Sequence, residues 1–139
     1  MENYDKEDQE ILLKDLFPRL VHGIYVKEDN GCDVIYTRYY HPNIVKCKPY
    51  LRPISSLTEK EYDRLFEILG IVPDASDKNE WLNKINDIGI LLIFIGEGKN
   101  FEDIIKAIEY LYSINVDFRG LIENGLAITA PENLYNKES

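Results

Sequence analysis

The sequence has no long apolar run, few cysteines and no basic leader, and each absence excludes a class of protein. Its longest apolar stretch, residues 88–95, spans eight residues, whereas a membrane-spanning helix needs about 20. The first eight residues are acidic and polar, whereas a secretory signal combines positive charge with an apolar core. Two cysteines cannot build a disulfide framework. We therefore expect a cytoplasmic protein with reduced thiols and no membrane association.

Positive charge is scarce and concentrated in one segment. The chain has 25 acidic and 16 basic residues and a net charge of −9, which argues against nonspecific binding to nucleic acid or anionic membranes because both are polyanions. Residues 34–58, in contrast, contain four basic residues and no acidic residue. The 139 residues, 45% of them hydrophobic, can bury a core without metal or disulfide. We expect a single domain over 1–139, with flexible polar ends at 1–5 and 132–139.

Turn patterns predict a small α+β domain with an antiparallel sheet. Asn30-Gly31 favours a tight turn, which predicts a hairpin over residues 21–38. Residues 44–48 are predicted to add a third strand. Pro49 and Pro53 are expected to prevent regular structure in the stretch that follows, because proline has no N–H to donate.

Apolar residues at helical spacing and capping patterns predict three or more helices packed on this sheet. The three segments are 7–17, which Pro18 is expected to end, 58–69, which begins with a Thr58 capping box, and 101–113, which Asn100 caps. A short helix is predicted over 80–86, a further helical turn over 118–123, and a short terminal strand after it. Residues 88–95 fit either a buried strand or the continuation of a helix, and we favour the strand because of their β-branched content and flanking glycines.

No group of residues has the spacing of a known catalytic or metal site. His22, Cys32, His41 and Cys47 could supply four zinc ligands, but structural zinc sites take their ligands in close pairs, and these four are widely spaced. A nucleophilic pair of Cys47 with either histidine would also need a lowered thiol pKa and an oxyanion hole. The glycines near residue 97 lack the spacing of a phosphate-binding loop. We therefore expect no enzyme activity, no metal and no cofactor.

The basic segment is interleaved with tyrosines, a mixture that occurs at protein-binding hot spots and on platforms for single-stranded RNA. We call residues 36–52 the basic aromatic segment. Its candidate partner-binding residues are Arg38, Tyr39, Tyr40, Lys46, Lys48, Tyr50 and Arg52. The alternative is that these are solvated basic side chains with tyrosines that fill a sheet.

Two elements of the sequence resemble a family of small phage and prophage proteins from gut and environmental bacteria. Residues 47–58, CKPYLRPISSLT, resemble its KP-x-LRP-[LI]-S-x-[LM]-T element, and residues 116–128, VDFRGLIENGLAI, resemble its FD-[YV]-x-GLI-x-x-GLA-[IL] ending. Tyr135 fits the tail that follows. One departure is at residues 113–115, where relatives often carry histidine and tryptophan. The resemblance implies a mobile-element origin and a cytoplasmic site of action, and it implies no activity.

These observations lead to two hypotheses for function. The first is a small acidic non-enzymatic protein that binds a host protein, such as a nucleic-acid-processing complex with a basic groove, as an anti-CRISPR-like inhibitor would. The second is an accessory protein that binds RNA or single-stranded nucleic acid directly through the basic aromatic segment. The two hypotheses place function on surfaces of opposite charge.

Overall fold

The computed structural model describes residues 6–39, 47–71 and 88–135, which form four α-helices and a mixed four-stranded sheet. The elements are α1 (Lys6–Leu20), β1 (Ile24–Lys27), β2 (Asp33–Tyr36), β3 (Lys48–Leu51), the 3-10 helix η2 (Ile54–Ser56), α2 (Glu59–Leu69), α4 (Ile88–Gly96), α5 (Phe101–Ser113) and β4 (Ile128–Thr129). The strand order is β2-β1-β3-β4. The predicted α+β class is confirmed.

The predicted hairpin is present as β1 and β2, which pair antiparallel from Ile24↔Tyr36 to Lys27↔Asp33. Its turn contains Gly31 at φ +83°, a left-handed conformation that glycine adopts without strain. The side chain of Asn30 accepts a hydrogen bond of 3.0 Å from the Cys32 N–H. The Asn-Gly pattern therefore identified the turn: the glycine adopts the left-handed conformation, and the asparagine side chain accepts a backbone hydrogen bond.

The rest of the sheet differs from the prediction of a purely antiparallel sheet with a strand at 44–48. Residues 44–46 lie outside the described part of the chain, and β3 runs from Lys48 through Pro49 to Leu51. Proline is tolerated because the β1–β3 ladder has only two residue pairs and Pro49 occupies its last one, opposite Val26. Strand β4 then pairs with β3 in parallel, so the sheet is mixed.

Two of the predicted helices are confirmed at almost the predicted bounds, the helix predicted over 7–17 is confirmed but extends further, and the strand favoured over 88–95 was predicted wrongly. Helix α1 does not end at Pro18 but continues to Leu20, because its last turn is held by a buried ion pair from Asp15 to Arg19. Residues 88–95 are not a strand but part of α4, which buries Leu91, Phe94 and Ile95 at helical spacing. The helix predicted over 80–86 lies outside the described residues, and in place of the helical turn predicted over 118–123 the structure has a non-helical turn over 121–125.

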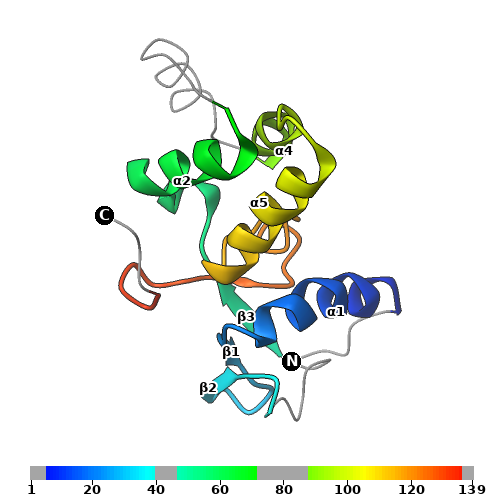
Figure 1. Ribbon diagram of the computed structural model, residues 1–139. Coiled ribbons are helices and arrows are strands. Elements are labelled where there is room, and N and C mark those ends of the chain that lie inside the picture. The colour runs from blue at the N-terminus through cyan, green and yellow to red at the C-terminus, as the bar shows by residue number, and fades with distance from the viewer. Residues whose placement is uncertain (1–5, 40–46, 72–87, 136–139) are drawn as a thin grey trace.

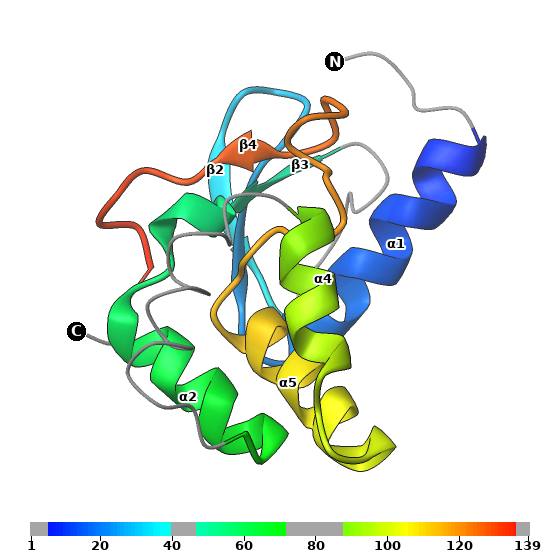
Figure 2. The same cartoon turned by 90° about the horizontal axis from the view of Figure 1, so that it is seen from above.

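The buried apolar side chains form two clusters. The helical cluster joins α2, α4 and α5 and includes Leu65, Phe94 and Leu111. The sheet cluster joins α1 to the sheet and includes Leu12 and Ile24. Figure 1 shows α2, α4 and α5 grouped at one end and the hairpin at the other, and in both Figure 1 and Figure 2 α5 lies between α2 and α1.

Candidate functional site

The two sequence elements that carry the family resemblance lie side by side. The Arg52 N–H donates a hydrogen bond of 2.8 Å to the Asn115 carbonyl, and the Asp117 N–H donates one of 2.9 Å to the Arg52 carbonyl. Earlier in the first element, Tyr50 pairs in parallel with Ile128 of the second. The two elements are therefore one hydrogen-bonded unit at the junction of the two clusters.

Arg52 lies at the centre of this unit and is only 2% exposed. Its guanidinium binds the Glu61 carboxylate at both ends, at 2.7 Å and 2.6 Å. It also donates to the Ser56 hydroxyl and carbonyl and to the Ile114 carbonyl. Arg52 lines a cavity of about 370 Å³, but all five of its N–H donors already have partners, so none is left for a ligand.

The same pair fixes the start of α2. Thr58 accepts from the Glu61 N–H at 3.2 Å, and the Glu61 carboxylate accepts from the Thr58 N–H at 2.9 Å, which completes the predicted capping box. Burial of Glu61 would raise its pKa, but the hydrogen bonds from Arg52 and Thr58 outweigh burial and hold the pKa below its ordinary value. The Arg52–Glu61 pair therefore joins β3 to α2 with both charges retained.

The second element is organised by Asp117. Its carboxylate accepts hydrogen bonds from the N–H groups of Arg119, Leu121 and Ile122, at 3.0–3.2 Å. These bonds cap the turn over 121–125, and Gly125 closes that turn at φ +77°. Both elements therefore have clear structural roles.

The structure separates the candidate residues of the basic aromatic segment. Arg52 and Tyr50 are buried, and the Tyr50 hydroxyl donates a hydrogen bond of 2.8 Å to Asp33. Burial and this hydrogen bond raise the pKa of Tyr50. Neither side chain is therefore part of an exposed basic surface, contrary to what their sequence neighbours indicated.

The other members of the segment are more exposed or lie outside the described residues. Tyr39 is 82% exposed, and the Arg38 guanidinium lies 4.9 Å from the centre of its ring. Lys48 is half-buried in β3. Tyr40 and Lys46 are outside the described residues. Arg38 and Tyr39 therefore remain as the described, exposed part of the segment.

A second buried ionic group was missed at the sequence level. Asp15 and Arg19 are both fully buried, and the carboxylate accepts two hydrogen bonds from the guanidinium, at 2.8 Å and 3.0 Å. Arg19 also donates to the Val116 carbonyl at 2.7 Å. Arg119 approaches the same carboxylate at 3.4 Å. An acid on the apolar stripe of a helix, with an arginine four residues later, was the available signal.

The candidate zinc and nucleophile residues do not assemble into a site in the part of the chain described. There, no three or more His, Cys, Asp or Glu side chains are grouped so that they could hold a metal ion. Cys47 is fully buried, and burial raises the pKa of its thiol to about 12, the opposite of what a nucleophile requires. Cys32 and His22 are exposed, and His41 lies outside the described residues.

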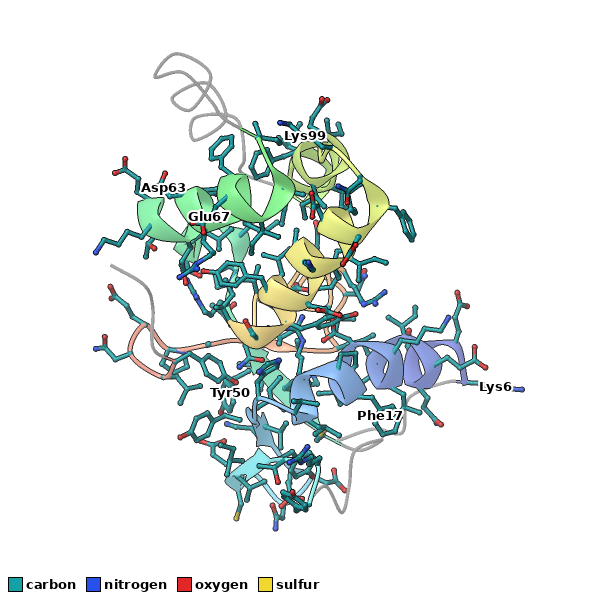
Figure 3. All side chains as sticks on the ribbon, viewed as in Figure 1. Lys6, Phe17, Tyr50, Asp63, Glu67 and Lys99 are labelled. Atoms are coloured by element: carbon teal, nitrogen blue, oxygen red, sulfur yellow. The ribbon has the colours of Figure 1, made fainter. Side chains whose placement is uncertain are left out.

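The acidic residues of α2 form an exposed row. Glu59, Asp63 and Glu67 follow one another at four-residue spacing, and all three are exposed. Lys60 and Arg64 form a second exposed row about 100° around the helix. Figure 3 shows Asp63 and Glu67 on α2, with Asp63 at the outer edge of the molecule. We call Glu59, Asp63 and Glu67 the acidic row.

Acids on α5 are placed differently. Glu102 lies 3.4 Å from Lys106 in an exposed ion pair, so part of its charge is compensated locally. Asp103 forms no ion pair within α5, but its side chain is half-buried. Its backbone N–H donates a hydrogen bond of 2.9 Å to the Asn100 side chain. Glu109 is exposed on the same side of α5 as Glu102 and Lys106, so a lysine interrupts the exposed acids of α5, whereas those of the acidic row follow one another without interruption.

No helix among the described residues is both long and apolar enough to cross a membrane. Comparison with known proteins gave no match to a family model, to a curated protein or to a solved structure.

Proposed function

We propose that this chain is a non-enzymatic protein of mobile-element origin that binds a host protein through its acidic surface. Its target would be a nucleic-acid-processing complex with a basic groove, and its effect would be inhibition or modulation, as for an anti-CRISPR protein. The observation that carries the proposal is the exposed acidic row on α2, together with the burial of Tyr50 and Arg52.

The charge distribution supports an acidic contact surface. The net charge is −9, and two of the basic side chains, Arg19 and Arg52, are neutralised inside the fold by Asp15 and Glu61. A basic groove attracts such a surface at long range, and the attraction raises the association rate more than the final affinity. Acids on a rigid helix also lose less freedom on binding than acids on a loop.

The pull-down that tests the proposal uses the full chain as bait in host lysate, with and without nuclease. We expect one host protein to be retained in a fixed ratio after nuclease treatment. Retention should fall for the double variant Asp63→Lys/Glu67→Lys and persist for the matched control Lys60→Glu/Arg64→Glu, which changes charge on the other row. Loss of all retention after nuclease, or equal retention by both variants, would contradict the proposal.

One observation favours direct binding of single-stranded nucleic acid as a second candidate. Tyr39 is 82% exposed and carries the Arg38 guanidinium over its ring, an arrangement on which a base can stack. A gel-shift titration with single-stranded and duplex RNA at two salt concentrations separates the candidates. We expect no shift at low salt, because the buried Arg52 cannot bind phosphate and the surrounding charge is negative. A low-salt shift that Tyr39→Ala removes would establish the second candidate instead.

A further inference from the structure

A groove on the opposite side of α5 from α2 combines apolar walls with one cation. It is lined by Ile11 of α1, Leu92 of α4, and Phe118 and Arg119 of the loop after α5, and its volume is about 410 Å³. Ile11 is 37% exposed and Leu92 46% exposed. Exposed apolar side chains that share one groove are typical of a contact surface.

Arg119 is held in one orientation within this groove. Its Nη2 donates a hydrogen bond of 2.6 Å to the Tyr112 hydroxyl, and its Nε lies 3.4 Å from the Asp15 carboxylate. The guanidinium also lies 5.3 Å from the centre of the Phe118 ring. The side chain is nevertheless 35% exposed. A guanidinium that is already ordered loses little entropy when it pairs with a carboxylate in two-point geometry.

The two arginines and two aspartates around the groove are not paired evenly. The Asp15 carboxylate is shared by two guanidiniums, and the shorter contacts go to Arg19. Arg19 is fully buried, and its Nη1 has no hydrogen-bond partner among the described residues. Asp117 is on the same loop, but its carboxylate is occupied by three backbone N–H groups and forms no ion pair with either arginine. Arg119 is therefore paired less closely than Arg19, and it is the one charged side chain among the four described residues that line the groove.

We propose that this groove binds a segment of a protein partner in which a carboxylate side chain lies beside apolar side chains. The carboxylate pairs with Arg119, and the apolar side chains pack on Ile11 and Leu92. Charge complementarity favours this occupant, because a purely apolar segment would desolvate a charged guanidinium and bury its remaining N–H donors without partners. The inference goes beyond the proposed function, since the groove lies on elements other than α2. It binds an acidic segment of a partner, whereas the acidic row of α2 binds a basic surface.

The test selects random dodecapeptides displayed on phage against the immobilised full chain and then measures the affinity of the enriched peptides as synthetic peptides. We expect enriched sequences to combine an acid with apolar residues and to shift the amide signals of Ile11, Leu92 and Arg119. Arg119→Gln should weaken binding at least about tenfold. Leu92→Asp, which changes none of the contacts between Asp15 and the two arginines, should weaken binding to a similar extent. Arg38→Gln, outside the groove, should leave the affinity unchanged. Circular dichroism establishes that each variant is folded.

Three outcomes would overturn the proposal. The first is a selection that enriches no peptide, or only peptides without an acid. The second is binding that Arg119→Gln and Leu92→Asp leave unchanged, or that shifts amides elsewhere. The third is self-association of the wild-type chain in analytical ultracentrifugation that Leu92→Asp abolishes, because a second copy would then be the occupant.

Discussion

Replacing Arg52 with methionine tests whether the first sequence element is structural. The substitution keeps most of the side-chain length but removes every hydrogen bond of the guanidinium. Glu61, which is fully buried, then keeps Thr58 as its hydrogen-bond partner, through the backbone N–H and the side chain. Ser56 is half-buried, so water can replace part of what its hydroxyl and carbonyl lose. The main loss is therefore the charge partner of a buried carboxylate.

Removing one partner of a buried ion pair destabilises a protein by about 3–5 kcal/mol. Small domains have a free energy of unfolding of about 5–15 kcal/mol, so we expect Arg52→Met to lose a large part of the total. Adding Glu61→Gln removes the stranded charge but keeps a side chain that can cap Thr58. The double variant should therefore recover most of the loss, which is a signature of coupling between the two residues.

Urea unfolding followed by circular dichroism at 222 nm measures these differences. Arg38→Met is the matched control, because Arg38 is exposed and its replacement should change stability by no more than about 0.5 kcal/mol. The reasoning is refuted if Arg52→Met loses less than about 1 kcal/mol, or if the double variant is as unstable as the single one.

Three further outcomes follow from the same contacts. Because the pKa of Glu61 is held below its ordinary value, the wild-type urea midpoint should fall as the pH falls below about 4.3. Arg52→Met should weaken this pH dependence. A wild-type midpoint that is constant down to about pH 3 would contradict the prediction. A thiol reagent should modify Cys32 in the native protein and Cys47 only after unfolding, since burial raises the pKa of the Cys47 thiol to about 12; rapid modification of both would show that Cys47 is accessible. Asp117→Ala removes three capping bonds and should lower the free energy of unfolding by about 1–2 kcal/mol, and an unchanged urea midpoint would argue against the capping role.

Local chemistry explains which parts of the fold the sequence could predict. The Thr58 capping box and the Asn30-Gly31 turn depend on residues within a few positions of one another, so their patterns are visible in the sequence. Residues 88–95 are apolar at almost every position, so they have no periodicity that separates a strand from a helix. The structure buries one side of this segment against α2 and α5, and that packing decides the outcome.

The buried arginines could not be found from charge alone. Arg52 belongs to a basic stretch, and its partner Glu61 lies nine residues later in another element. Nothing short of the tertiary fold shows that the two meet. For Asp15 and Arg19, the four-residue spacing was visible, but an exposed helix pair has the same spacing. The sequence therefore left an acidic and a basic surface open, and burial, which the sequence does not display, weakens the basic one because it removes two of the seven members of the basic aromatic segment.

The most direct test of the proposed function is the affinity of the retained host protein for two charge variants of α2. Calorimetry at two salt concentrations would compare the wild type with Asp63→Lys/Glu67→Lys and with Lys60→Glu/Arg64→Glu. We predict that the first variant binds at least about tenfold more weakly and loses much of the salt dependence, while the second binds as well as the wild type or better. Equal affinity of all three proteins for the host protein would contradict the claim that the acidic row is the contact surface.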